Sequence, residues 1–320
     1  MPPATRLGLT VPLTGVPLAE HPDLFRRAEA AGYDDLWTGE TNGADGFTPL
    51  AVAAAVTSTI RLGTGVVNPY TRGPSILAQH AAALQDASGG RFVLGLGSSS
   101  DVIVERWNGV PFVKPLTRVR EAVRELRPVL AGERGRGGFK LETPPATRVP
   151  IVVAALRGKM LALAAAEGDG AFSNWLPLSG VRQVADAFGA PEKELVCRFF
   201  CIPQPAEEAM GLAKWMFAAY GTVGVYAEFF RWLGWGERID PMVEAWRGGE
   251  RERALELVPE ELVREIFLFG RPEEMAERAR AFAEQGITTL VLTPIAPPAD
   301  LPGLVDALAP SRQGPASSVA

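Results

Sequence analysis

Short polar clusters follow several of the apolar, strand-like runs of this sequence, and they contain most of the side chains that could do chemistry. Serine, asparagine and threonine are frequent in these clusters, whereas general acids and bases are scarce. In chain order the clusters are 40–42, 68–72, 98–101, 157–159 and 174–175. Small neutral groups suit a flat, polar cofactor that brings its own reactivity, because the protein then needs only to position and polarise it.

Acids and histidines limit what the side chains could do without such a cofactor. Glu40 and Asp101 are the obvious acids of the clusters, and they would act as a glycosidase pair only if they faced one another across a shared site. The two histidines, His21 and His80, are too few for a multi-histidine metal site. We therefore predict no bound metal.

A candidate anion site lies where a helix-like run opens directly after a strand-like one, at ALRGKMLALAAAEG. Backbone N–H groups at a helix start bind phosphate well, and Arg157 and Lys159 would add positive charge beside Gly158. The alternative reading is a solvated first turn with two ordinary surface cations. The sequence leaves both open.

The elements that would position these clusters alternate between apolar strands and amphipathic helices. Strand-like runs cover 6–11, 34–40, 60–67, 91–97, 150–156, 168–175, 194–202 and 286–294, with helix-like runs between most of them. Near-continuous Val, Leu and Ile strands are typical of a parallel sheet covered on both faces. This series predicts an α/β protein with a closed (β/α)8 TIM barrel, whose chemistry sits at the carboxyl ends of the strands.

A long segment, about 203–270, interrupts the alternation and is rich in aromatic residues. We expect a helical insertion after strand seven, at the end of the barrel where enzymes carry substrate-binding elements. Alternatively, its aromatic residues only pack the insertion onto the barrel or onto a partner subunit. We predict a single domain over 1–310 and a disordered tail over 311–320, because that stretch is small and polar and contains Pro and Gly.

Composition and charge exclude several classes of partner. The chain has 320 residues, 47% hydrophobic and 22% charged, with a net charge of -5. Nucleic-acid binding needs concentrated Lys and Arg, and no basic stripe is present. No window approaches the roughly 18 apolar residues of a membrane span, and the first residues lack the pattern of a secretory signal. We expect a cytoplasmic protein that acts on a small molecule.

Four stretches of the sequence resemble the luciferase-like monooxygenase family: GYDDLWTGE, LGTGVVNPYTRGP, LQDASGGRFVLGLGSSSDVIVERWNG and PIVVAALRGKMLALAAAEGDGAFSNW. Within that family they are most similar to the oxidoreductases that use the deazaflavin coenzyme F420. The resemblance covers about residues 6–308. It implies a TIM barrel of the bacterial luciferase-like type, a homodimer, and coenzyme F420 bound at the carboxyl-terminal mouth.

The resemblance also implies roles for individual positions. Relatives support the central ring of the cofactor on a non-prolyl cis peptide in strand three, and Gly65–Val66 is the matching bond. Asn68 matches a contact to the ring or to its side chain, and the serines at 98–99 match a turn at the polar side chain of the cofactor. The implied cofactor-binding residues are Gly65, Val66, Asn68, Ser98, Ser99, Arg157, Gly158, Lys159, Asn174 and Trp175. The catalytic candidates are Glu40 and Asn68.

Departures from the family pattern leave the activity open. Related deazaflavin enzymes place Asp and His where this chain has Glu40 and Thr41, and a sugar-phosphate dehydrogenase branch has Glu where Ser100 stands. A sugar phosphate is therefore not the expected substrate. Our hypothesis is hydride transfer between coenzyme F420 and an unsaturated or carbonyl-containing molecule. The alternatives are an FMN-dependent monooxygenase that uses reduced flavin and oxygen, and a flavin-binding barrel without turnover.

Overall fold

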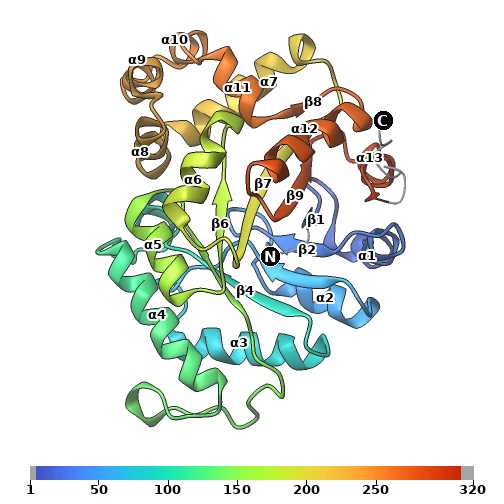
Figure 1. Cartoon of the computed structure of the whole chain (residues 1–320), viewed down its shortest axis with the longest axis vertical. Helices are drawn as coiled ribbons and strands as arrows, with labels where there is room; N and C mark the ends of the chain where they lie inside the picture. The colour runs from blue at the N-terminus through green and yellow to red at the C-terminus, as the bar shows by residue number, and fades with distance from the viewer. Residues whose placement is uncertain (1–4, 311–320) are drawn as a thin grey trace.

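The computed structural model describes residues 5–310, and these form a closed parallel β-barrel surrounded by helices (Figure 1). Neighbouring strands pair in chain order, and the pairs β6–β7, β7–β9 and β9–β1 close the ring. The sheet has nine strands, of which the short β8 pairs with β7 outside the ring. The predicted (β/α)8 TIM barrel is thereby confirmed. The predicted disordered tail, 311–320, lies outside the described residues.

The strands agree closely with the apolar runs of the sequence. They are β1 (Arg6–Val11), β2 (Asp35–Thr38), β3 (Arg61–Thr64), β4 (Phe92–Leu96), β5 (Ile151–Ala154), β6 (Gly170–Asn174), β7 (Glu194–Ile202), β8 (Leu268–Phe269) and β9 (Thr289–Pro294). Most strands are one to three residues shorter at an end than the apolar runs that predicted them. Where the carboxyl end is shorter, the last residues of the run belong to the loop that carries the polar cluster.

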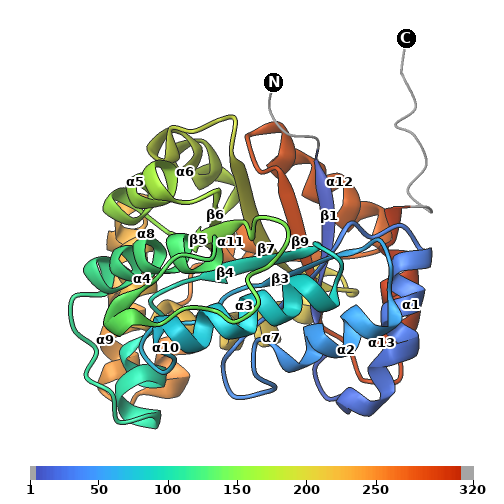
Figure 2. The same cartoon turned by 90° about the horizontal axis from the view of Figure 1, so that it is seen from below.

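Helices cover the outside of the ring on all sides (Figure 2). Those that follow barrel strands are α1 (His21–Ala30), α2 (Thr48–Val56), α3 (Pro74–Ala87), α4 (Pro115–Leu130), α5 (Gly158–Glu167), α6 (Val181–Phe188), α12 (Pro272–Glu284) and α13 (Leu301–Ala307). A π-helical segment that the sequence did not predict, Val102–Trp107, lies between β4 and α4. Single 3-10 turns lie at Leu18–Glu20, Arg136–Gly138 and Leu178–Gly180.

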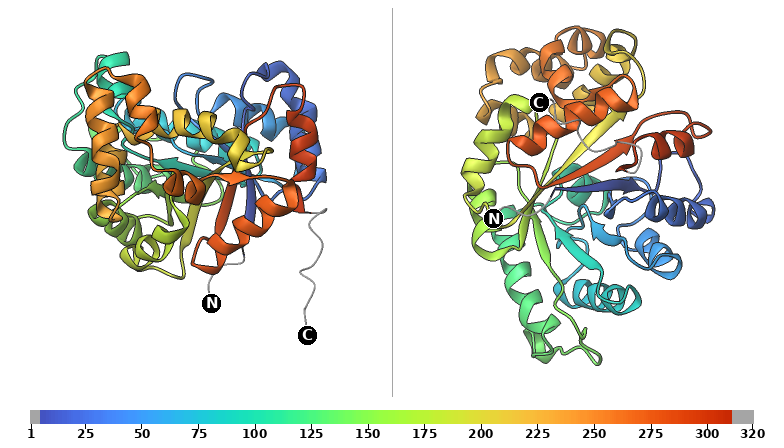
Figure 3. Two further views of the ribbon diagram at one scale, coloured as in Figure 1. Left: turned by 90° about the horizontal axis from the view of Figure 1, so that it is seen from above. Right: turned by 45° about the vertical axis from the view of Figure 1, so that its right-hand side comes forward.

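The segment between β7 and β8 is helical, as the sequence predicted. Its helices are α7 (Ala206–Gly221), α8 (Gly224–Trp232), α9 (Gly236–Arg247), α10 (Arg251–Glu256) and α11 (Glu260–Ile266). They pack on one another, α7 against α8, α9, α10 and α11, and Figure 3 shows them grouped in yellow and orange at one side of the strands. We call this group, α7 to α11, the insertion.

Large rings fill the inside of the barrel. The buried cluster there comprises Trp37, Val93, Val152, Phe172, Val196 and Val291, and Trp37 meets Phe172 edge to face with ring centroids 5.3 Å apart. A Cβ atom at Gly63 would lie 2.4 Å from Trp37, and one at Gly65 would lie 2.8 Å from Phe172. Glycine therefore alternates along β3 because the inner face has no room for a side chain.

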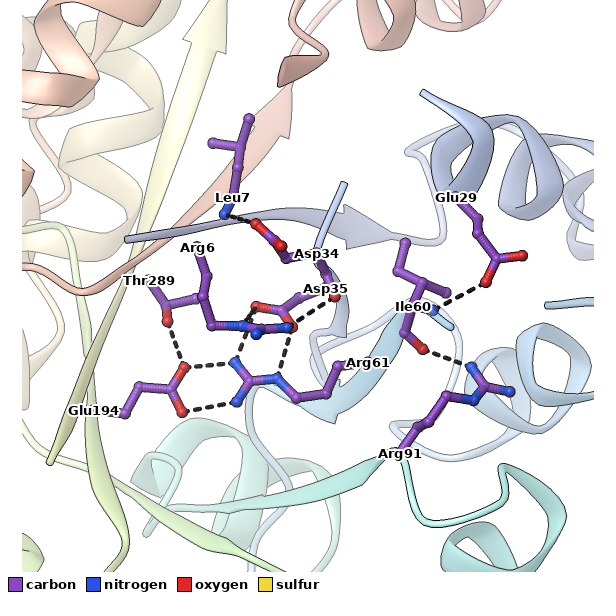
Figure 4. A network of polar contacts seen from close by, with 10 residues as sticks. All are labelled: Arg6, Leu7, Glu29, Asp34, Asp35, Ile60, Arg61, Arg91, Glu194 and Thr289. Carbon is purple, nitrogen blue, oxygen red and sulfur yellow. Dashed lines mark hydrogen bonds and ion pairs between the residues drawn. The ribbon is translucent and has the colours of Figure 1, made fainter. Parts of the chain in front are cut away.

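Ion pairs close the barrel at the amino ends of its strands (Figure 4). Arg61 reaches across the ring, where its Nε donates to Asp35 Oδ1 at 2.6 Å and its Nη1 donates to Glu194 Oε2 at 3.0 Å. Arg6 binds the same Asp35 at 2.7 Å, and the Thr289 hydroxyl donates to Glu194. Burial alone would lower the pKa of Arg61, but Asp35 and Glu194 raise it above its ordinary value. We call this group the basal network.

The carboxylate of Glu29 binds the loop that enters β3, and this residue is also drawn in Figure 4. Glu29 Oε1 accepts the backbone N–H groups of Ser58, Thr59 and Ile60 at 2.9, 2.6 and 2.9 Å. Desolvation works to raise the pKa of Glu29, but these hydrogen bonds outweigh it and lower the pKa to about 2. The amino end of the barrel is thus held by polar groups that all have partners.

Candidate active site

A cavity of about 910 Å³ opens at the carboxyl ends of the barrel strands. Its wall combines the segments that follow β2, β3, β4 and β5 with residues of β6 and β7 themselves and of α7 and α8 from the insertion. The insertion supplies Tyr220, Val223, Gly224, Val225, Tyr226, Glu228 and Trp232. The aromatic segment therefore does more than pack on the barrel, because it forms one side of the cavity.

Most of the predicted site residues meet at this cavity. Those that line it are Glu40, Gly65, Val66, Ser98, Ser99, Arg157, Gly158, Lys159 and Asn174. They lie at the carboxyl ends of five different strands, which the barrel brings together. Asn68 and Trp175 do not line it.

Asn68 is buried in the turn that it begins. Its Oδ1 accepts the backbone N–H groups of Tyr70 and Thr71, both at 3.0 Å, and the Thr71 hydroxyl at 3.1 Å. An Asn side chain that bonds the backbone two and three residues ahead is a turn-forming device. The side-chain oxygen is thus engaged in shaping the loop after β3, and we leave Asn68 out of the proposed binding and catalytic set.

Trp175 lies behind the cavity wall and supports it. The residue has a left-handed backbone with φ 55°, and its fully buried ring packs on Phe200 and Tyr220 with centroids 4.3 and 4.9 Å apart. Both of these neighbours line the cavity. Trp175 therefore packs against two aromatic wall residues and does not itself line the cavity.

The peptide bond between Gly65 and Val66 is cis, as the family resemblance implied. Gly65 donates its N–H to the Thr38 carbonyl at 2.7 Å. Gly97 on the adjacent strand end leaves room for Val66, since a Cβ there would lie 2.7 Å from both Val66 and Ala154. Backbone and small side chains, those of Gly65, Val66 and Ala154, thus form this part of the wall.

Two polar groups lie next to this wall, after the next two strands of the sheet. Ser98 and Ser99 follow β4, and Ser99 has a left-handed backbone with φ 62°, a conformation that few non-glycine residues adopt. After β5, α5 begins at Gly158 with no side-chain cap on its first turn, so backbone N–H groups of this turn are available to an anion. Arg157 and Lys159 line the cavity beside it.

Glu40 is held by its own loop. Its carboxylate binds the Arg72 guanidinium at 2.7 Å and accepts the Gly46 N–H at 3.1 Å. Arg72 in turn lies over the Phe47 ring, 5.4 Å from the centroid. A carboxylate with a cationic partner and a backbone donor serves best as a fixed acceptor, so we do not assign proton transfer to Glu40.

Sequence reasoning missed Arg198 and Tyr226, which both line the cavity. Asn174 Nδ2 donates to the Tyr226 hydroxyl at 3.1 Å, while Asn174 Oδ1 is buried and has no partner among the described residues. Burial raises the pKa of Tyr226 to about 12. The sequence did carry a signal for Arg198, because it is the one charged residue in the interior of the strand ELVCRFFCI. It alternates with Val196 and Phe200, so the three side chains lie on the same face of the strand.

The charges of the cavity wall are unbalanced. Its two carboxylates, Glu40 and Glu228, each have an arginine partner, at 2.7 and 2.6 Å. Its three cations, Arg157, Lys159 and Arg198, make no ion pair within residues 5–310. A chain with net charge -5 therefore presents a positive cavity, which favours an anionic ligand.

The described part of the chain contains neither a cluster of metal-binding side chains nor a helix that could span a membrane. Within residues 5–310, no three His, Cys, Asp or Glu side chains gather so as to hold a metal ion. Across the same range, none of the helices combines the length and apolarity needed to cross a bilayer.

A parallel (β/α)8 barrel with a large cavity at the carboxyl ends of its strands defines a TIM-barrel enzyme. The family model for luciferase-like monooxygenases matches residues 5–289. The chain belongs to this family.

Individual relatives agree with the match. A candidate coenzyme F420-dependent oxidoreductase of Mycobacterium tuberculosis is 30% identical, over 90% of this chain and 94% of its own length. The 5,10-methylenetetrahydromethanopterin reductase of Methanolobus tindarius is 30% identical, over 84% of this chain and 89% of its own. The structure of the coenzyme F420-dependent tetrahydromethanopterin reductase of Methanopyrus kandleri superposes with a TM-score of 0.76 at 22% identity, covering 96% of this chain and 98% of that one.

Proposed function

We propose that this enzyme is a coenzyme F420-dependent oxidoreductase that transfers a hydride between the deazaflavin and a small organic molecule. The observation that carries the proposal is the composition of the cavity: a wall of backbone and small side chains after β3, a serine turn after β4 and a cationic helix start after β5 line it side by side. Relatives that bear the name of coenzyme F420 support the choice of cofactor.

The residues present fit each part of this cofactor. The bond Gly65–Val66 and the glycine at 97 would receive the ring, because larger residues there would meet Phe172 or Ala154. Ser98 and Ser99 offer hydroxyls to the polyhydroxylated side chain. Arg157 and Lys159, with the first N–H groups of α5, would hold its phosphodiester.

The chain supplies positioning, exclusion of water and a proton-bearing group. When bound, the reduced cofactor supplies the hydride. Phe112, Leu116 and Trp232 line the cavity, and apolar side chains of this size would displace water from a bound substrate. The Tyr226 hydroxyl accepts from Asn174 and keeps its own proton at neutral pH, so it can donate a hydrogen bond to a substrate oxygen. We assign this role to Tyr226 in place of Glu40.

Titration with oxidised coenzyme F420 tests the proposal directly. We expect fluorescence quenching at micromolar protein, and weaker binding by about tenfold or more in Arg157→Gln and Lys159→Gln, since each loses a charged contact to phosphate. Arg124→Gln is the matched control, because Arg124 is an exposed arginine of α4 that pairs with Glu167. No change on addition of coenzyme F420 would refute the proposal.

A parallel titration with FMN addresses the alternative within the same family. Tighter binding of FMN than of coenzyme F420, with oxygen consumption in the presence of a flavin reductase, would replace our proposal by a monooxygenase. If coenzyme F420 binds but no candidate donor or acceptor changes its redox state, the barrel is a binding protein. Neither outcome is expected, because relatives named for coenzyme F420-dependent redox chemistry support both the cofactor and turnover.

We also propose a homodimer. Large apolar side chains lie exposed at Trp107, Val113 and Trp215, with 55%, 61% and 56% of their surfaces accessible. Exposed aromatic side chains are frequent at protein interfaces. Light scattering on the purified protein checks the mass, and a monomer at micromolar concentration contradicts the expectation.

A further inference from the structure

Arg198 forms the floor of the cavity. It lies on β7 at the inward register, opposite Asn174 of β6, and its guanidinium carbon is 5.6 Å from the centroid of the Phe172 ring. Its Nη2 donates to the backbone carbonyls of Thr38, at 3.4 Å, and Gly65. Its Nε is buried and has no partner in the described structure.

This environment leaves a positive charge uncompensated. Removing a guanidinium from water without a carboxylate partner is costly, and desolvation lowers the pKa of Arg198 below its ordinary value. Arginine nevertheless keeps its proton in proteins. Backbone carbonyls accept from Nη2, Nη1 makes no hydrogen bond among residues 5–310, and the residue lines the cavity.

Among residues 5–310, no carboxylate is placed to neutralise this charge from within the cavity. Glu40 is bound by Arg72 and Glu228 by Arg231. The other side chains of the wall are largely apolar: Val66, Ile103, Phe112, Leu116, Leu156, Met160, Phe172, Phe200, Val223 and Trp232. A ligand that complements this surface has an apolar body and one delocalised negative charge.

We propose that Arg198 binds a delocalised oxyanion on the ligand, and that the substrate is an apolar organic acid whose carboxylate lies on this guanidinium. The planar fork of N–H donors matches a carboxylate, and Tyr226 stands near enough to interact with Arg198 electrostatically. The inference names the substrate class for the cavity of the proposed function. The acidic edge of the deazaflavin ring offers the same chemistry, and the experiment separates the two sources.

The first arm of the experiment uses the protein without cofactor. Phenylacetate and its neutral counterpart phenylacetamide are titrated by calorimetry and by thermal shift. We expect phenylacetate to bind at least about tenfold more tightly, and this preference to disappear in Arg198→Gln and Arg198→Met. Arg157→Gln, a cation at the rim of the same cavity, should retain the preference.

The second arm measures the affinity of oxidised coenzyme F420 for the wild type and for Arg198→Gln. A loss of about tenfold or more here, without any preference for phenylacetate in the first arm, assigns the oxyanion to the cofactor ring. A preference for phenylacetate that depends on Arg198 assigns it to the substrate, and this result would stand even if coenzyme F420 does not bind at all.

Two results would overturn the inference. One is that neither phenylacetate nor coenzyme F420 distinguishes Arg198→Gln from the wild type. The other is that the preference for phenylacetate follows Arg157 and not Arg198, which would place the anion at the rim. Far-UV circular dichroism of each variant shows that the barrel has folded, so loss of binding is not confused with loss of structure.

Discussion

Two arginines stand at opposite ends of the same aromatic filling of the barrel, and only one has carboxylate partners. Arg61 at the amino end lies 5.5 Å from the Trp37 ring centroid and binds Asp35 and Glu194. Arg198 at the carboxyl end lies 5.6 Å from the Phe172 ring centroid and forms no ion pair among residues 5–310. The charge of Arg61 is balanced by carboxylates of the folded chain, whereas the charge of Arg198 is complementary to an anionic ligand.

This contrast agrees with the division of labour in TIM barrels, where the amino end serves stability and the carboxyl end carries chemistry. Here the difference can be stated in terms of partners. Each carboxylate of the basal network accepts from an arginine, while the cavity contains the unpartnered Arg198 Nε and Asn174 Oδ1. A bound ligand could supply partners to both of these cavity groups.

The largest expected effect tests the stabilising end of the comparison. Arg61→Met should lower the free energy of unfolding by about 3–5 kcal/mol, because it removes one partner of a buried network and leaves Asp35 and Glu194 under-compensated. Urea denaturation measures the loss. A change below about 1 kcal/mol would mean that the basal network does not stabilise the barrel.

A smaller loss of stability is expected at the amino end of the barrel when Glu29 is replaced, and this loss depends on pH. The pKa of Glu29 is lowered from 4.5 to about 2 in the folded protein, so its contribution is fully present above pH 4.5 and is lost as the pH falls toward 2. We expect Glu29→Gln to cost about 2 kcal/mol at neutral pH. The wild type and the variant should converge in stability as acid is added, and curves that stay parallel would contradict this assignment.

At the carboxyl end, the shape of the cavity wall can be altered without changing charge. Gly97→Ala would place a Cβ 2.7 Å from Val66 and Ala154, which should cost about 1.5 kcal/mol through overpacking and weaken binding of coenzyme F420. Gly211→Ala is the control, because no atom lies within 4 Å of a Cβ there and the residue belongs to α7. That variant should be as stable as the wild type or slightly more stable.

The smallest expected change in stability distinguishes Arg198 from Arg61 most clearly. Arg198→Met should leave the free energy of unfolding within about 1 kcal/mol of the wild type or raise it, because an unpaired buried cation is replaced by an apolar chain of similar length. The same substitution at Arg61 is the matched case. Equal losses in Arg61→Met and Arg198→Met would show that Arg198 is structural, through its bonds to the Thr38 and Gly65 carbonyls.

Much of the fold could be predicted because each strand carries its own evidence. A run such as RFVLGLG is apolar, of strand length and bounded by turn residues, and eight runs with helices between them leave few architectures. The serine turn and the start of α5 were also visible, because polar residues that directly follow a strand belong to the loop at its carboxyl end. The domain limits and the cofactor roles of these residues stay predictions.

Asn68 shows where that reasoning reaches its limit. The residue follows a strand as the rule requires, but its side chain turns back to bind Tyr70 and Thr71. The dipeptide Asn68-Pro69 indicates a turn, but only the structure shows that the side-chain oxygen is used up in it. Tyr226 shows the converse. It lies in the insertion, and only the packing of α8 over the barrel mouth brings its hydroxyl to Asn174.

The local pattern of residues thus determined the elements, their order and the barrel, since hydrophobic periodicity and turn chemistry act over a few residues at a time. Both arginines are visible in the sequence, but the sequence does not show that Arg61 is paired with carboxylates and Arg198 is not. Whether a charge is paired depends on which strands lie opposite each other across the ring, and closure of the barrel alone placed Glu194 beside Arg61 and left Arg198 facing an apolar cavity.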